Sequence, residues 1–305
     1  MVPCYNEQET VAQFYEAVAG VLKTLTGRVD HEVIFVDDGS GDATLLIIKD
    51  ICSQYPDVKY LSFSRNFGKE SALYAGLAKA RGDYAVVMDC DLQDPPALLP
   101  DMLAAIQDGD FDSVATRRVT RKGEPALRSF FARTFYRIIN KISDTEFVDG
   151  ARDYRMMDRK MVDAILKMKE SDRFSKGLYS WVGFSTKWVE YENVQRVAGE
   201  TKWSTWRLFI YSLNGIMAFS AAPLAISSFF GLFLCFASIA YGLFMVIRTW
   251  IFGNAVPGYP SLFTAIVFIG GVQLFCIGIL GMYVAKVFEE TKKRPLYVTK
   301  EESEG

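Results

Sequence analysis

Helical and strand periodicity alternate along the first third of the chain. Apolar residues recur at helical spacing in some stretches and form short unbroken runs in others. The pattern predicts helices at 10–25, 44–53, 69–80 and 97–107, and strands at 33–36, 58–63 and 84–88. Strands that alternate with helices of this length indicate an α/β fold with a mostly parallel sheet. Such sheets bind ligands beyond the carboxyl ends of their strands.

The segment before the first helix, Val2–Glu7, has the pattern of a strand end followed by its turn. A sheet of this kind is expected to open with about five apolar residues before Val2. We therefore expect the start of the sequence to be truncated or misassigned.

The last third of the chain carries two long apolar runs, 221–247 and 261–285, and neither contains a charged residue. Each is long enough to cross the hydrocarbon core of a membrane. Neither is N-terminal, so neither is a signal peptide. The sequence therefore predicts a transmembrane hairpin within 221–287.

Basic residues flank the outer ends of this hairpin. Lys202 and Arg207 precede it, and four follow it, namely Lys286, Lys292, Lys293 and Arg294, whereas the connecting loop has only Arg248 at its border. Positive charge marks the cytoplasmic side of a membrane protein. We therefore predict a cytoplasmic domain at 1–200, an amphipathic helix along the interface at 201–220, and a cytoplasmic tail at 288–305.

Composition narrows the choice of chemistry. The chain is 50% hydrophobic with a formal net charge of −2, which gives no support to nucleic-acid binding. The five cysteines have no metal-type spacing and fit a reducing compartment. His31 is the only histidine and precedes a strand, so we interpret it as a surface residue. Chemistry of the Ser-His-Asp type is therefore excluded as a leading hypothesis.

Polar clusters follow three of the predicted strands: Asp37-Asp38, Arg65-Asn66, and the pair Asp89 and Asp91. Carboxylates at a sheet edge suit Mg²⁺ or Mn²⁺, with substrate phosphates completing the shell. A lone Asp-x-Asp is more often an acidic loop that caps the next helix. The convergence of three polar strand ends favours a binding site over that alternative.

Six motifs, in this order, resemble those of the family 2 glycosyltransferases. They are Val2–Glu7, Asp37–Ser40, Asn66–Glu70, Asp89–Pro96, Asp149–Arg155 and Arg196–Trp203. With the hairpin, the chain is most similar to the polyprenyl-phosphate glycosyltransferases, the bactoprenol glucosyltransferases and dolichyl-phosphate mannose synthases. The resemblance runs from Val2 to about Lys293. It implies a Rossmann-like, nucleotide-sugar-binding domain of the GT-A type before the membrane hairpin.

The resemblance also implies residue roles. Metal binding falls to Asp89 and Asp91, and catalysis to Asp153 and Asp91. Nucleotide-sugar binding falls to Pro3, Tyr5, Glu7, Asp38, Asp89, Gln93, Arg196 and Lys202. Asp153 matches the position usually given to a catalytic base. However, a phosphate monoester is largely ionised at pH 7, so a role in positioning the acceptor or the metal stays open beside the base role.

The acceptor side is predicted from basic residues. The segment 127–142 interleaves arginines with aromatic residues, which suits a membrane surface. The alternative is a solvated charged face over a core stripe. We predict that Arg117 and Arg128 bind the lipid phosphate.

The expected reaction is an inverting, metal-dependent transfer of a hexose from UDP-glucose to undecaprenyl phosphate. It would take place at the cytoplasmic face of a bacterial inner membrane. Mannose, galactose, N-acetylhexosamine and aminoarabinose-type donors remain open, and so does a non-catalytic membrane scaffold that retains the fold. A processive synthase should show more spans and a Gln-x-x-Arg-Trp motif, which the sequence lacks. Glycines in the second span, such as Gly270 and Gly271, allow either a homo-oligomer or close packing within one hairpin.

Overall fold

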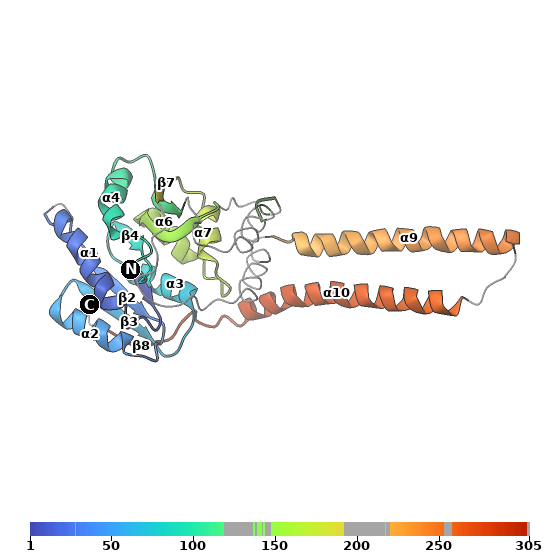
Figure 1. Ribbon diagram of the computed structural model, residues 1–305, viewed down its shortest axis with the longest axis horizontal. Helices are drawn as coiled ribbons and strands as arrows, with labels where there is room; N and C mark the ends of the chain where they lie inside the picture. The colour runs from blue at the N-terminus through green and yellow to red at the C-terminus, as the bar shows by residue number, and fades with distance from the viewer. Residues whose placement is uncertain are drawn as a thin grey trace. The chain divides into compact units, whose positions relative to one another are not determined.

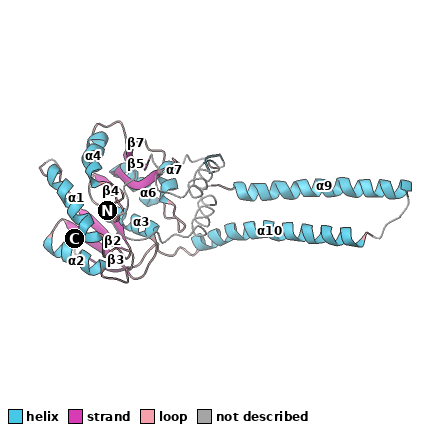
Figure 2. Ribbon diagram, in the orientation of Figure 1, coloured by secondary structure: helices cyan, strands magenta, loops and turns pink. Residues whose placement is uncertain are grey.

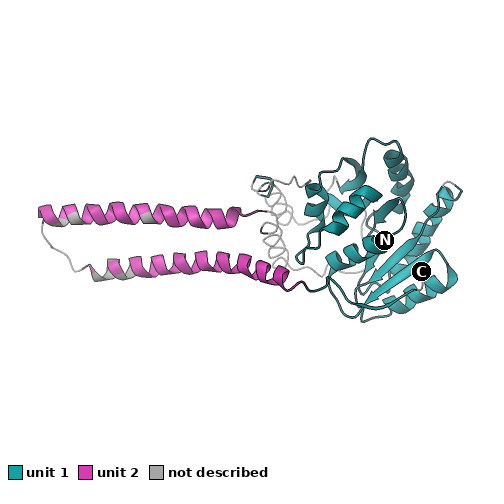
Figure 3. Ribbon diagram, turned by 180° about the vertical axis from the view of Figure 1, so that it is seen from behind, with its two compact units in different colours: residues 1–218, 294–305 teal, residues 219–293 magenta. Residues whose placement is uncertain are grey.

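The computed structural model describes residues 1–27, 29–118, 137, 139–141, 143, 148–191, 217, 220–252 and 258–303. The chain divides into two compact units (Figure 3). Unit 1 comprises Met1–Ala218 and Arg294–Gly305, and unit 2 comprises Phe219–Lys293.

Unit 1 opens with a four-stranded sheet in the order β1-β2-β3-β8. Its strands are β1 (Val2–Cys4), β2 (Val33–Asp37), β3 (Val58–Phe63) and β8 (Thr299–Glu302). The first three are mutually parallel, and β8 pairs antiparallel with β3. All five residues of β2 are buried, as expected for a central parallel strand that is covered on both faces.

Helices cover both faces of this sheet (Figures 1 and 2). They are α1 (Val11–Leu25), α2 (Thr44–Gln54) and α3 (Lys69–Lys79). Alternate side chains of β2 point to opposite faces. Phe35 packs in the cluster formed with α1 and α2, whereas Ile34 and Val36 pack with α3. Two core layers therefore hold β2 in place and fix where its carboxyl end lies.

A second four-stranded sheet has the order β4-β6-β5-β7. Its strands are β4 (Tyr84–Val87), β5 (Ser113–Arg118), β6 (Ala151–Asp158) and β7 (Thr186–Tyr191). Its helical elements are η1 (Pro96–Leu98), α4 (Leu99–Gln107), α6 (Arg159–Lys167) and α7 (Ser175–Trp181). Strand β6 runs antiparallel to both β4 and β5, while β5 and β7 are parallel.

Residue Met1 joins the two sheets. Its amino group donates to the Val86 carbonyl at 2.6 Å, and its carbonyl accepts from the Met88 amide at 3.1 Å. The ends of β2 and β4 therefore lie at the same edge of the domain. The predicted α/β fold is confirmed, and each predicted helix and strand of the first third is present. The sheet is mixed because β6 and β8 run against their neighbours.

Unit 2 consists of α9 (Ala222–Phe252) and α10 (Tyr259–Thr291). Both are long and apolar enough to cross a membrane, by length and composition. Large apolar side chains on them are exposed, Phe229, Trp250 and Leu274 among them. Within the unit, the Tyr283 hydroxyl donates to the Ser220 carbonyl at 2.8 Å. Such outward apolar faces suit a lipid environment. Most of the predicted helices at 127–142 and 201–220 lies outside the described residues.

Candidate active site

The turn after β2 is a rigid part of the site. Asp37 accepts from the Ser40 amide at 3.1 Å and from the Ser62 hydroxyl at 2.8 Å. Gly39 follows with φ of +66°, and a Cβ there would lie 2.4 Å from the Arg65 carbonyl carbon. Only glycine fits this approach. The predicted Asp37–Ser40 motif is therefore a turn whose shape depends on each of these residues.

Asp38 fastens this turn to the loop before α3. Its carboxylate accepts from the Phe67 amide at 2.6 Å and from the Gly68 amide at 2.9 Å. Burial raises its pKa, and these backbone hydrogen bonds act the other way. In this structure Asp38 organises the Asn66–Glu70 loop. Its predicted contact with the nucleotide stays a prediction.

The turn after β1 is fastened to the same region. Asn6 has φ of 54°, and its side-chain oxygen accepts from the Gly41 amide at 2.9 Å. Glu7 donates its amide to Thr44 Oγ1 at 2.8 Å and accepts from Thr10 Oγ1 at 2.8 Å. The neighbouring Tyr5 is 43% exposed. Its ring is thus accessible to a flat ligand such as a base.

Three carboxylates, Asp89, Asp91 and Asp153, form what we call the carboxylate edge. Asp89 and Asp91 follow β4, and Asp153 lies near the start of β6. The antiparallel register pairs Val87 with Arg155, so its continuation places Asp153 opposite Asp89. The chain reversal at β6 is thus what brings two distant motifs together.

A lysine bridges two of these carboxylates. Lys69, the first residue of α3, donates to Asp153 Oδ2 at 2.5 Å and to Asp89 Oδ2 at 2.8 Å. Burial opposes ionisation of Asp153, but the charges of Lys69 and Lys176 outweigh it and hold the pKa of Asp153 well below its usual range. The Asp153 carboxylate is therefore a weak base in this arrangement.

The loop after Asp91 is held by a buried ion pair between Asp94 and Arg152. Asp91 Oδ1 accepts from the Gln93 amide at 3.1 Å. Arg152 Nε donates to Asp94 Oδ1 at 3.1 Å, and its Nη2 donates to Gln93 Oε1 at 3.2 Å. Tyr191 also donates its hydroxyl to Asp94. Burial raises the pKa of Asp94, although the charge of Arg152 and the Tyr191 hydroxyl lower it.

Removal of this buried anion should destabilise unit 1. The Asp94 side chain is fully buried and that of Arg152 is 24% exposed. We expect Asp94→Ala to lower the free energy of unfolding by about 3 kcal/mol, since a buried cation would lose its partner. In thermal denaturation of the full chain in detergent, the midpoint should fall by roughly 6 °C or more.

Asp163→Ala is the matched control for this variant. Asp163 pairs with Arg159 at 3.9 Å on α6, and its side chain is 57% exposed. An exposed pair contributes less than about 1 kcal/mol. An equal fall in both variants would contradict the structural role given to Asp94.

Helix α7 is fixed against this region by a second carboxylate. Glu70 accepts from the Ser175 amide at 2.9 Å and from the Ser175 hydroxyl. Lys176 then donates to the Ala151 carbonyl at 3.0 Å. Lys69, Glu70, Asp94, Arg152 and Lys176 were not among the predicted site residues. The first four lie inside three of the six motifs, and this placement is the feature of the sequence that could have identified them.

The predicted residues fall into two clusters, with Arg117 apart from both and three residues outside the described ranges. Asp89, Asp91, Gln93 and Asp153 gather at one edge, and Pro3, Tyr5, Glu7 and Asp38 lie at the adjoining ends of β1 and β2. Arg117 lies on β5, where its Nε donates to the Asp149 carbonyl at 3.1 Å and its Nη1 is 3.8 Å from Glu190. Arg128, Arg196 and Lys202 lie outside the described residues.

The carboxylate edge has the chemistry of a site for a hard divalent cation. Among the residues that the structure describes, no group of three or more Asp, Glu, His or Cys side chains is arranged to hold a metal by itself. Mg²⁺ often takes one or two carboxylates and fills its shell with phosphates and water. Asp89 already lies 2.7 Å from one cation, the Lys69 ammonium. Asp89 and Asp91 therefore have the chemistry of Mg²⁺ or Mn²⁺ ligands, and in this structure the Lys69 ammonium contacts both oxygens of Asp89.

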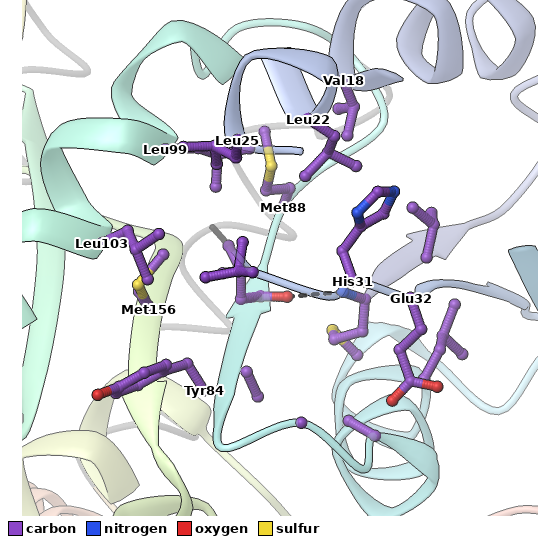
Figure 4. A pocket seen from close by; sticks show the side chains of 18 of the residues that line it. Val18, Leu22, Leu25, His31, Glu32, Tyr84, Met88, Leu99, Leu103 and Met156 are labelled. Carbon is purple, nitrogen blue, oxygen red and sulfur yellow. Dashed lines mark hydrogen bonds between the residues drawn. The ribbon is translucent and has the colours of Figure 1, made fainter. Parts of the chain in front are cut away.

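A cavity of about 490 Å³ lies at the amino ends of β2 and β4, opposite the strand ends that carry the polar motifs (Figure 4). Its lining is mostly apolar and includes Val18, Met88 and Leu103. His31 also lines it, and its Nε2 is 3.0 Å from Asp57 Oδ2. His31 is exposed, as predicted. The cavity is at the amino ends of the strands, whereas ligands of α/β sheets bind at the carboxyl ends.

Comparisons with known proteins agree with the motifs. The model of "Glycosyl transferase family 2" matches residues 1–166. A prophage bactoprenol glucosyl transferase homolog of Escherichia coli (strain K12) is 43% identical and covers 98% of this chain and 97% of its own length. The bactoprenol glucosyl transferase of Shigella phage SfV is 42% identical over 100% of this chain and 98% of its own.

Among solved structures, the chain is similar to glucosyl-3-phosphoglycerate synthase from Mycobacterium tuberculosis in complex with Mn²⁺, UDP-glucose and phosphoglyceric acid. The TM-score is 0.45 and the identity 21%. The likeness covers 71% of this chain and 76% of that one.

Proposed function

This chain belongs to glycosyl transferase family 2, and from that premise we propose that it transfers a hexose from a nucleotide sugar to a polyprenyl phosphate. It is a glycosyltransferase with a GT-A type α/β domain and two apolar C-terminal helices. The observation that carries the proposal is the carboxylate edge, built from two motifs of the family at the carboxyl end of a strand. The relatives named bactoprenol glucosyl transferases support the lipid acceptor, since they match almost the whole chain.

The proposed topology follows from the two helices and the charges around them. Residues 1–200 would form the cytoplasmic domain, 201–220 an interfacial helix, 221–287 the hairpin and 288–305 a cytoplasmic tail. This topology in a bacterial inner membrane keeps the domain on the side where nucleotide sugars are made and holds it close to its lipid acceptor. Arg117 and Arg128 remain the proposed contacts of the acceptor phosphate.

UDP-glucose is the proposed donor, and Asp89 and Asp91 are the proposed ligands of Mg²⁺ or Mn²⁺. When bound, the metal neutralises charge that develops on the departing nucleoside diphosphate. Gln93 lies beside these carboxylates, and Arg152 fixes its side-chain oxygen. Asp94 holds Arg152 in turn. Buried groups thus orient the loop that would face the diphosphate, so it needs little rearrangement when the donor binds.

The proposed step is a direct displacement at the anomeric carbon. An oxygen of the acceptor phosphate forms a bond to this carbon, while the bond to the diphosphate oxygen breaks and its electrons leave with the diphosphate. An α-linked donor would give a β-linked lipid, which is inversion. The acceptor is already ionised near pH 7, so Asp153 need not remove a proton. Its proposed role is to hold the cationic groups that position the acceptor.

Transfer from a panel of radiolabelled nucleotide sugars to undecaprenyl phosphate tests this proposal. We expect the purified full chain in detergent to label the lipid fraction from UDP-glucose with Mg²⁺ or Mn²⁺, and not with EDTA. Label from a mannose, galactose, N-acetylhexosamine or aminoarabinose-type donor would keep the reaction and correct the sugar. No transfer from any donor, in protein that still binds nucleotide, would favour a non-catalytic scaffold.

A further inference from the structure

Lys69 is the cation of the carboxylate edge. Its Nζ lies 2.7 Å from Asp89 Oδ1 and 2.5 Å from Asp153 Oδ2, and the side chain is 43% exposed. Its backbone position is fixed, because the preceding Gly68, at φ 99°, donates its amide to buried Asp38. The ammonium therefore lies between β4 and β6 as a consequence of the fold.

This position conflicts with a metal at Asp89. Both oxygens of Asp89 lie within hydrogen-bond distance of the same ammonium. A divalent cation would need those oxygens at about 2.0–2.1 Å, and it would repel a positive charge a few ångströms away. Lys69 must therefore move from Asp89 before a metal can take its full place there.

The balance of charge at the edge indicates which group the Lys69 ammonium contacts after it leaves Asp89. Asp89, Asp91 and Asp153 bring three negative charges to the edge, and in this structure Lys69 is the cation in contact with two of them. A divalent metal arrives with the diphosphate of the nucleotide sugar, whose two negative charges balance those of the metal, and a third negative charge develops on the diphosphate as the sugar leaves. A phosphate oxygen is then the strongest acceptor within reach of the three N–H donors of Lys69.

We propose that Lys69 is a resident counter-ion that competes with the metal for Asp89, and that it binds a substrate phosphate once the metal–nucleotide has entered. This rests on the proposed function and extends it to an order of events. The bare metal binds weakly, and the nucleoside diphosphate and metal bind together. Lys69 then contacts a phosphate oxygen of either the donor or the acceptor.

Lys69→Met tests the competition, since methionine keeps the unbranched stem and removes the charge. The experiment measures the affinity of the full chain for Mn²⁺ in detergent without nucleotide. Electron paramagnetic resonance gives the concentration of free Mn²⁺ at each point of the titration. We expect the variant to bind Mn²⁺ at least roughly tenfold more tightly than the unaltered chain. Lys69→Arg keeps the charge and should retain weak binding. This measurement needs no turnover, so it does not depend on the donor or acceptor assigned above.

Lys79→Met is the matched control. Lys79 lies on the same helix α3 and pairs with Glu302 at 2.9 Å, so its loss should leave Mn²⁺ binding unchanged. If Lys69 only fastened α3 to the sheet, Lys69→Met would bind Mn²⁺ with equal or lower affinity. That result, in protein whose circular dichroism matches the Lys79→Met control, would overturn the proposal. Should Lys69→Met not fold, Lys69→Gln takes its place with the same expectation.

Kinetics then identify the phosphate that Lys69 binds. A higher KM for the nucleotide sugar in Lys69→Met assigns the contact to the donor diphosphate, and a higher KM for the polyprenyl phosphate assigns it to the acceptor. Either outcome supports a phosphate contact. Unchanged KM values for both, at any kcat, would exclude it.

Discussion

Asp91→Ala is expected to remove lipid-linked glycosyl transfer, with kcat lower by on the order of 10³-fold. Asp91 is a proposed metal ligand. The next carboxylate in the same loop, Asp94, is fully buried and paired with Arg152, so it cannot replace Asp91. Loss of the Asp91 charge leaves the metal with a single carboxylate ligand from this strand end. The initial rate of label transfer to undecaprenyl phosphate, at saturating donor and acceptor, measures the effect.

Asp91→Asn separates charge from local structure. Asp91 Oδ1 accepts the Gln93 amide, and an asparagine oxygen can still accept it. We expect Asp91→Asn to lose nearly as much activity as Asp91→Ala, because the charge is what the metal requires. Asp83→Ala is the control, since Asp83 is exposed at the opposite end of β4. Full activity in Asp91→Asn would show that the carboxylate holds the turn and does not bind a metal.

The first third of the fold could be predicted because its periodicity is strong and its order is local. Buried runs such as Val33–Val36 and amphipathic helices such as 10–25 each encode their own structure. The strand ends then converge by the topology of a parallel sheet. The sequence alone therefore places Asp37, Asp89 and Asp91 at one edge of the sheet.

The direction of β6 could not be predicted in the same way. Periodicity reports which residues are buried, but it does not report whether a strand runs with or against its neighbour. The pairing of Val87 with Arg155 joins segments far apart in sequence. The position of Asp153 opposite Asp89 follows from that pairing, and the bridge by Lys69 also needs the turn before α3 that Asp38 fixes.

Strand β8 could not be predicted from the sequence for a different reason. Its four residues, Thr299–Glu302, are polar and mostly exposed, so no apolar alternation marks it. Backbone pairing with β3 and the ion pairs Lys49–Glu301 and Lys79–Glu302 hold it, at 2.7 and 2.9 Å. An edge strand held by backbone and charge has little hydrophobic signal. The segment after the second apolar helix therefore pairs with β3, although its composition gives no sign of a strand.

Lys69 was overlooked because a lysine at the start of a predicted helix has the pattern of an ordinary solvated side chain. Its role depends on Asp89 and Asp153, which belong to two other motifs. The ion pair of Asp94 with Arg152 is a similar case, since each residue alone fits a turn or a surface. The partners of charged residues inside the motifs are thus visible only in the tertiary structure.

Asp153→Asn should lower kcat by about 10²-fold through lost positioning, without the pH signature of a missing base. Burial opposes ionisation of Asp153, but the charges of Lys69 and Lys176 hold its pKa well below the usual range. Its pKa in the unfolded chain is about 3.9, so its ionisation stabilises the fold above that pH. This contribution is lost only as the pH falls through the lower folded-state value.

The pH–rate profiles of the unaltered chain and of Asp153→Asn distinguish the two roles of Asp153. An anion with so low a pKa is ionised throughout an assay between about pH 5 and 9. The acid limb of both profiles should therefore follow the second ionisation of the acceptor phosphate, near 6. We expect the variant to keep this limb at a uniformly lower rate. A rate in Asp153→Asn that recovers steadily as the pH rises would show that hydroxide replaces a missing base, and would restore Asp153 to that role. A uniform loss would instead mean that Asp153 works through the cations that it holds, with Lys69 first among them.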